Sequence, residues 1–205
     1  MRLNLKAKYS RREGAPVSDR SAHAKALVRR PFAPGVHGPN GNKRTTEYAK
    51  QLREKQKAKR IYGLNERQFR NLFDEAASKQ GDTGETLVRL LELRLDNAVY
   101  RAGFAKTRAA ARQFVSHAHF DVNGKKVNIP SYRVRPGEMI SVRGIKQNKG
   151  NWKTAAETLA KHEAPSWLAL TRGGELSAKV TGAPAGTELQ QPFDVKLIVE
   201  FYSRQ

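Results

Sequence analysis

Apolar residues after Asn65 recur at the spacing of an amphipathic helix. The stripe occupies positions i, i+3, i+4 and i+7 and consists of Phe69, Leu72, Phe73 and Ala76. Asn65 can cap this helix, and Gln68 at the third helical position completes a capping box. The pattern therefore predicts a helix with one face directed at a core.

Similar signals on either side predict two more helices. Thr45 or Thr46 can cap a mostly polar helix that ends before Gly63. Asp82 with Glu85 forms a second box-like start, before an apolar run of leucines. We expect the whole segment 45–93 to be helical.

Beyond Arg94 the pattern predicts two short helices and a small sheet. The first helix ends at Gly103 and Thr107 caps the second. Their apolar faces consist of Leu95, Ala98, Val99 and Ala102, and of Ala111, Phe114, Val115 and Ala118. Asn123-Gly124 lies between two short strand-like runs and predicts a β-hairpin, because both turn positions require positive φ. The run from Met139 predicts a third strand.

The C-terminal quarter gives weaker signals. Residues 149–163 are typical of a short helix, and residues 181–188 of a loop. Trp167, Leu168 and Leu170 are expected to form a local core. The β-branched and aromatic residues of 194–202 favour a closing strand. Together these elements predict an α+β fold class, a mainly helical domain with a small helix-helix-β-hairpin module.

Charge is concentrated at the N-terminus. The chain of 205 residues has 39 Lys and Arg against 19 Asp and Glu, a net charge of +20. Residues 1–60 hold 17 of the cations and 4 of the anions. Such a surplus favours a polyanionic partner, because it accelerates encounter with phosphates and releases counterions on binding. Nucleic acid is the leading partner class.

The first 44 residues also contain several prolines and glycines that disfavour regular structure. We expect residues 1–44 to be an extended basic arm that RNA orders, the alternative being a solvated disordered tail. The remaining organisation is a helical domain at 45–93 completed by 190–205, an RNA-binding module at 94–150, and a C-terminal helix, loop and strand at 151–205.

Composition excludes several classes of protein. The absence of cysteine excludes disulfides, thiolate zinc sites and a cysteine nucleophile. No apolar run approaches the roughly 20 residues that span a bilayer, and the basic N-terminus lacks the apolar stretch of a secretory signal. We expect an intracellular protein without a membrane partner.

A cationic surface is expected around the helix that Thr107 caps. Outside the apolar stripe of this helix, or next to its ends, lie Lys106, Arg108, Arg112, Gln113, His117 and His119. The hairpin would bring Lys125 and Lys126 close to them. Arginine can bind phosphate through two parallel hydrogen bonds, and glutamine can reach 2′-hydroxyls or base edges. This composition suits recognition of folded RNA by shape and backbone. The alternative is a solvated basic face.

No catalytic or metal-binding constellation is evident. His117 and His119 could ligate zinc with Asp121 nearby, but no further ligand is evident. The glycines at 35–41 lack the spacing and the following Lys-Ser/Thr of a phosphate-binding loop. We expect no catalytic residue, no metal, no cofactor and no small-molecule substrate.

Several separate motifs resemble one family. Residues 94–138, RLDNAVYRAGFAKTRAAARQFVSHAHFDVNGKKVNIPSYRVRPGE, are similar to the RNA-binding module that takes its name from ribosomal protein S4. PGVHG at 34–38, EYAKQLREKQKAKRIYGLNERQF at 47–69, LLELRLDN at 90–97 and the ending LIVEFYSR resemble the small-subunit ribosomal protein S4 family itself, of the cysteine-free bacterial type. The order of these motifs makes the resemblance specific.

The resemblance implies a role and a set of RNA contacts. It implies a structural constituent of the small ribosomal subunit that binds 16S rRNA directly, nucleates assembly of the subunit body, contributes to translational accuracy and touches neighbouring ribosomal proteins. The location would be the cytoplasm, with an organelle ribosome still open. In the module, the implied contacts are Lys106, Thr107, Arg108, Arg112, Gln113, His117, Asn123, Gly124 and Lys125. In the arm and the first helix, cations add Arg29, Arg30, Lys43, Arg44, Arg53, Lys55, Lys57 and Arg60.

Two other functions share some of these features. An RNA-modifying enzyme that uses the module as an accessory needs a separate catalytic domain, and the helical segment 45–93 is too short to be one. A general nucleic-acid chaperone or DNA compactor shares the charge but does not require the hairpin module.

Overall fold

The computed structural model describes residues 5–40, 45–147, 152, 159, 162–171, 176–189 and 191–204. They form two compact units, one of residues up to 88 together with those from 190 onward, the other of residues 89–189. One unit is helical and the other combines helices with an antiparallel sheet, which confirms the predicted α+β class.

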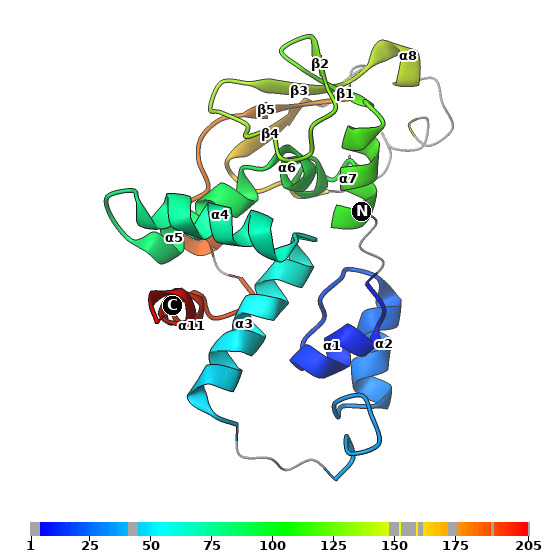
Figure 1. The fold of residues 1–205 in the computed structure, drawn as a ribbon. Helices are drawn as coiled ribbons and strands as arrows, with labels where there is room; N and C mark the ends of the chain where they lie inside the picture. The colour runs from blue at the N-terminus through cyan, green and yellow to red at the C-terminus, as the bar shows by residue number, and fades with distance from the viewer. Residues whose placement is uncertain are drawn as a thin grey trace. The chain divides into compact units, whose positions relative to one another are not determined.

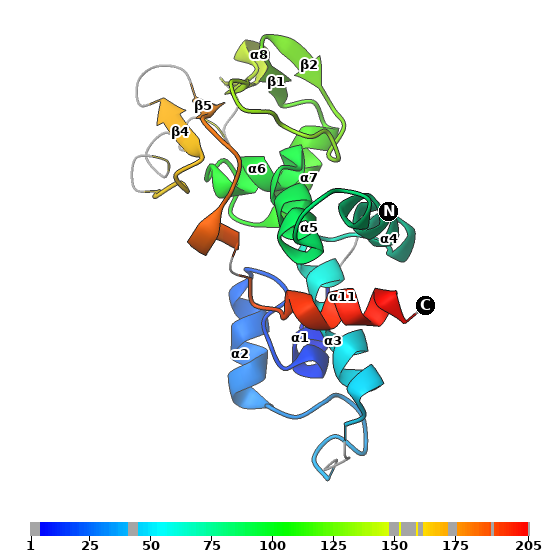
Figure 2. The same cartoon turned by 90° about the vertical axis from the view of Figure 1, so that its left-hand side faces the viewer.

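The helical unit begins where the sequence predicts an extended arm. Within residues 5–40 the structure instead has two short helices, α1 (Lys8–Glu13) and α2 (Ser21–Arg29). Both views show them side by side (Figures 1 and 2). A buried hydrogen bond of 2.7 Å between Ser10 Oγ and His23 Nδ1 joins them. This pair lies 13 residues apart in sequence, which explains why local helix signals did not predict it.

The predicted caps at the next helices are confirmed. The helices are α3 (Glu47–Ile61), α4 (Glu66–Ala77) and α5 (Thr83–Glu92), the last of which crosses the division between the units. Thr46 caps α3, and Asn65 with Gln68 forms the complete capping box of α4. Asp82 Oδ1 accepts a hydrogen bond of 2.8 Å from the Glu85 amide at the start of α5.

The chain's last element completes the helical unit as a helix, α11 (Val195–Ser203), which packs across α3 (Figure 2). The predicted strand at 194–202 is therefore wrong. Ile198, Phe201 and Tyr202 are buried at helical spacing, and Asp194 caps the first turn. Tertiary packing of this stripe overrides the β propensity of the segment.

The mixed unit places two helices against one sheet. The helices α6 (Leu95–Arg101) and α7 (Arg108–Ser116) precede β1 (Phe120–Val122), β2 (Lys125–Val127) and β3 (Met139–Val142) as predicted. They are followed by α8 (Gly144–Gln147), β4 (Leu168–Thr171), β5 (Ser177–Val180) and a 3-10 turn at Gly186–Leu189. The described strands form one antiparallel sheet in the order β2-β1-β3-β5-β4 (Figure 1).

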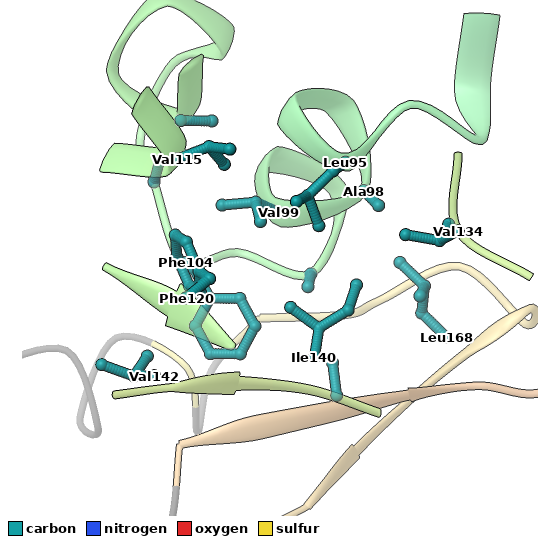
Figure 3. Packing of buried hydrophobic residues seen from close by; sticks show 14 of the residues in the cluster. Leu95, Ala98, Val99, Phe104, Val115, Phe120, Val134, Ile140, Val142 and Leu168 are labelled. Atoms are coloured by element: carbon teal, nitrogen blue, oxygen red, sulfur yellow. The ribbon is translucent and has the colours of Figure 1, made fainter. Parts of the chain in front are cut away.

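The core of this unit lies between the helices and the sheet. Figure 3 shows Leu95, Val99 and Val115 from the helices facing Phe120 and Ile140 from the strands. The sequence predicted the helical side of this core. It missed β4 and β5. Of the local core expected there, Trp167 and Leu168 are buried, and Leu170 is partly buried against the same core. The helix predicted at 149–163 lies almost wholly outside the described residues.

Candidate nucleic-acid interface

Helix α7 presents its polar side chains away from the core. The Thr107 hydroxyl accepts a hydrogen bond of 3.2 Å from the Ala110 amide, so this side chain starts the helix. Ala111 and Val115 are fully buried. Lys106, Gln113 and His117, three of the expected contacts, are exposed.

The two arginines of α7 are half-buried and tied to α6. Arg108 Nε donates to Asn97 Oδ1 over 2.9 Å, and its guanidinium lies 4.4 Å from the centre of the Tyr100 ring. Arg112 Nη1 donates to Asp96 Oδ2 over 2.9 Å. Both guanidinium groups of α7 are therefore held at defined places by acceptors on α6.

Their acceptors on α6 belong to a buried polar network. Arg94 donates to both oxygens of Asp96, over 3.1 Å and 2.9 Å. Asn97 donates to a Glu92 carboxylate oxygen over 2.8 Å. Arg101 donates twice to the same carboxylate group, over 2.8 Å and 3.0 Å. Carboxylates buried in this way persist because they are paired and hydrogen-bonded.

The hairpin next to α7 has the predicted turn. Asn123 and Gly124 have φ of 49° and 74°, and the Asn123 side chain accepts a hydrogen bond of 2.9 Å from the Met139 amide. Lys125 pairs with Val122 and Lys126 with Asp121, so the two lysines lie on opposite faces of the sheet. The expectation that both join one patch is therefore wrong, because neighbouring strand residues alternate in direction.

His119, the second of the two histidines that follow α7, has a structural partner. Trp152 Nε1 donates to His119 Nδ1 over 3.0 Å, and the Phe114 ring lies 5.3 Å from the His119 ring. Among the described residues, no group of three His, Asp or Glu side chains gathers as metal ligands would. In that same part of the chain, no helix has the length and apolar character needed to cross a bilayer.

The expected contacts of the helical unit divide into surface and interior residues. Arg29 and Arg30 at the end of α2 are exposed. The Arg53 side chain on α3 lies 3.5 Å from the Glu13 carboxylate but is 48% exposed. Lys43 and Arg44 lie outside the described residues. Of the contacts expected in this unit, the exposed arginines therefore form the available cationic surface.

Two further expected contacts on α3, Lys57 and Arg60, are largely buried and paired inside the unit. Lys57 pairs with Glu54 at 2.5 Å, and Arg60 pairs with the buried Glu13 while its guanidinium lies 4.6 Å from the Tyr9 ring centre. These contacts span up to 47 residues of sequence. Sequence reasoning missed Glu13 because a single carboxylate in a basic segment carries no local signal of burial.

Lys55 is buried, although the sequence predicts an RNA contact there. Its ammonium donates to Glu66 Oε1 over 2.7 Å and lies 4.2 Å from the Phe201 ring centre. The helix α11 packs on α3 and covers Lys55, which the strand predicted at 194–202 did not lead us to expect. Lys55 is therefore a residue of the interior and does not belong to the cationic surface.

Glu66 is the ionic centre of this contact. Partial burial raises the pKa of its carboxyl, but hydrogen bonds from Lys55 and Lys59 outweigh that effect and lower the pKa from 4.5 to about 2. Tyr202 donates to Glu66 over 3.0 Å, and burial followed by the Glu66 charge raises the pKa of the Tyr202 phenol. The cluster joins α3, α4 and α11.

The α+β fold and the cations along α2, α3 and α7 define a basic nucleic-acid-binding protein. Residues 3–92 match the family model described as the Ribosomal protein S4/S9 N-terminal domain, and residues 93–140 match the S4 domain. The small ribosomal subunit protein uS4 of Chlorobium limicola is 46% identical to the chain over 197 residues. That of Roseiflexus castenholzii is 49% identical over 200 residues, and each alignment covers 96% of both chains. The chain belongs to the ribosomal protein S4 (uS4) family.

Proposed function

We propose that this chain is a structural, non-catalytic constituent of the small ribosomal subunit. In this role it binds 16S rRNA directly and early, nucleates assembly of the subunit body and contributes to translational accuracy. The observation that carries the proposal is similarity to uS4 proteins along 96% of the chain. The net charge of +20 supports it, because a surplus of cations favours a polyanion over a protein or small-molecule ligand.

The proposed RNA interface has two parts. On the mixed unit it comprises Lys106, Arg108, Arg112, Gln113, His117, Lys125 and the backbone of the Asn123-Gly124 turn. On the helical unit it comprises Arg29, Arg30 and Arg53, with Lys43 and Arg44 added from the sequence alone. The roles differ by residue type. Arginines bind phosphate in pairs of hydrogen bonds, whereas exposed Gln113 suits a 2′-hydroxyl or a base edge.

Thr107, Lys55, Lys57 and Arg60 are assigned structural roles in this proposal. The Thr107 hydroxyl already accepts the first hydrogen bond of α7. Lys55, Lys57 and Arg60 each have a carboxylate partner inside the helical unit, and their side chains are at most 16% exposed. Their removal should act on stability before it acts on RNA.

The proposed partners are 16S rRNA and neighbouring proteins of the small subunit, with no membrane and no small-molecule substrate among them. The proposed location is the small ribosomal subunit of the cytoplasm. Sedimentation of a cell extract tests this directly, because a subunit constituent moves with 30S particles and remains on them after a moderate salt wash.

Selective affinity for folded rRNA tests the molecular proposal. The full chain should bind fragments of folded 16S rRNA more tightly than duplex DNA of equal length at every salt concentration. Equal affinities that fall with the same salt slope would instead identify a general nucleic-acid chaperone or DNA compactor, since charge alone would then explain binding.

A further inference from the structure

A carboxylate lies next to the arginines proposed to meet RNA. Asp96 contacts Arg112 at 2.9 Å, although an anion at such a place repels phosphate. Its side chain is only 7% exposed, so it cannot make an extended contact with RNA itself. Its charge must therefore serve another purpose within the unit.

Asp96 shares its two oxygens between two arginines. Both oxygens accept from Arg94, whose side chain is 4% exposed, and Oδ2 also accepts from Arg112, whose side chain is 33% exposed. Arg94 thus holds the carboxylate in place from the interior. The bond from Arg112 uses one of the five N–H donors that an arginine carries, so donors remain that a phosphate can accept from.

Asn97 holds the guanidinium of Arg108 in place through its neutral amide group. Its amide nitrogen donates to the Glu92 side chain over 2.8 Å and to the Glu92 backbone carbonyl over 3.1 Å. These two bonds fix which end of the amide is oxygen, and that oxygen accepts from Arg108. Glu92 is in turn held by Arg101, which pairs with the same carboxylate group.

We propose that Asp96 and Asn97 are positioning residues of the RNA interface, which hold the guanidinium groups of Arg112 and Arg108 in the geometry that binds phosphate. The inference rests on the proposed function, because it presumes that these arginines face RNA. A flexible arginine loses rotamer freedom on binding, and a guanidinium already fixed by a buried acceptor loses less. Asp96 and Asn97 on α6 therefore raise the affinity of the arginines on α7 for RNA without touching RNA themselves.

Asp96→Asn distinguishes positioning from charge, because the two effects have opposite signs. The substitution raises the net charge by one unit, which by itself strengthens binding to a polyanion. Asparagine has one acceptor oxygen in place of two, so it cannot serve Arg94 and Arg112 as before. Positioning predicts that D96N weakens binding to the folded 16S rRNA fragment about three- to tenfold, within the usual coupling of contacting side chains.

A double-mutant cycle separates this effect from a general loss of structure. In the Arg112→Ala background, D96N should change rRNA affinity less than about twofold, since the guanidinium it positions is absent. A loss of equal size in both backgrounds would show that Asp96 acts on the fold alone and would overturn the inference. Unchanged or tighter binding of the single variant D96N would overturn it as well.

The reference variants test the proposed function separately. If Arg112→Ala and Arg108→Ala both bind rRNA as the natural chain does, α7 does not face RNA and the interface itself is wrong. If they weaken binding while D96N and Asn97→Ala do not, the interface stands and only the positioning role fails.

Asn97→Ala keeps the inference falsifiable if D96N does not fold. It changes no charge, so the salt slope should stay the same while affinity falls, and the fall should vanish in the Arg108→Ala background. All variants are full-length chains whose folding is checked by circular dichroism, and binding is measured below the lowest unfolding midpoint. An unaltered affinity of folded N97A would reject the role of Asn97.

Discussion

A lysine's neighbours, and not its charge, decide what it does in this protein. Lys55 and Lys106 are alike in sequence terms, since Lys55 lies in a basic segment predicted to be helical and Lys106 lies just before a predicted helix. Lys55 is 6% exposed and contacts a carboxylate and two aromatic rings, whereas Lys106 is exposed. The first was predictable as helical but not as buried, because the helix that covers it lies more than a hundred residues later in the chain.

Replacing each lysine by alanine should therefore give opposite results. Lys55→Ala leaves Glu66 without its closest cation and removes packing against α11, and it should destabilise the protein by about 1–3 kcal/mol. Lys106→Ala should change stability by less than about 0.5 kcal/mol. Denaturant unfolding checks both values. Affinity for the rRNA fragment, measured where both variants are folded, should fall for Lys106→Ala alone, and the reverse order would contradict the assignment.

The ion pairs of Glu66 predict how acid affects the helical unit. Because the pKa of Glu66 is lowered to about 2 in the folded protein, the unfolded chain takes up a proton first as pH falls. The stabilisation is complete above pH 4.5 and is lost as pH falls toward 2. Its size is modest, since the Glu66 side chain is 46% exposed and solvent screens its pairs.

Glu66→Gln isolates this contribution. Thermal unfolding of the natural chain and of the variant should differ above pH 4.5, with the variant less stable, and the difference should shrink as pH falls toward 2. A difference that stays constant over this range would show that Glu66 acts through packing and not through its charge.

Among the elements, helices with a cap and a stripe could be predicted from local residues, and those with conflicting signals could not. Asn65 with Gln68 defines α4 completely, whereas 194–202 is rich in β-branched and aromatic residues yet forms α11. The stripe of α11 repeats at i, i+3 and i+4, and it finds its partner on α3. Strands β4 and β5 lack alternation in the sequence. Strand β5 pairs with β3 and β4 pairs with β5, and no local pattern reveals this pairing.

A capping variant tests the helical state of α11. Asp194 Oδ1 accepts a hydrogen bond of 2.9 Å from the Lys196 amide, so Asp194→Ala should destabilise the protein by about 1 kcal/mol, while Asp194→Ser should largely retain the cap. Chemical denaturation measures both. If alanine and serine are equivalent, the side chain does not cap a helix there.

For the molecule as a whole, the sequence was enough to predict a basic RNA-binding protein with a mainly helical domain and a helix-helix-β-hairpin module. It could not predict which charges neutralise one another across long separations. The buried Glu13, for example, pairs with Arg60, which lies 47 positions away in the sequence. Of the four cations expected on α3, the side chains of Lys55, Lys57 and Arg60 are 8%, 12% and 16% exposed, whereas Arg53, which also pairs with Glu13, is 48% exposed. The cations expected at the end of α2, Arg29 and Arg30, are exposed as well.

The salt dependence of rRNA binding tests whether that remaining surface binds phosphate. Every phosphate that a variant no longer neutralises should reduce the slope of log affinity against log salt by about 0.7–0.9, because fewer counterions are released. The double variant Arg29→Gln and Arg30→Gln should therefore lower the slope by about 1–2 units.

Arg67→Gln with Arg70→Gln is a matched control, since both arginines are exposed on α4 and the same charge is removed. The control should lower affinity slightly through the weaker overall field and leave the slope nearly unchanged. Equal slopes for the two double variants would mean that the field of the whole chain, and not binding by α2, determines affinity. Because such a field acts on any polyanion, that outcome would also remove the helical unit from the proposed interface and leave specificity to the mixed unit alone.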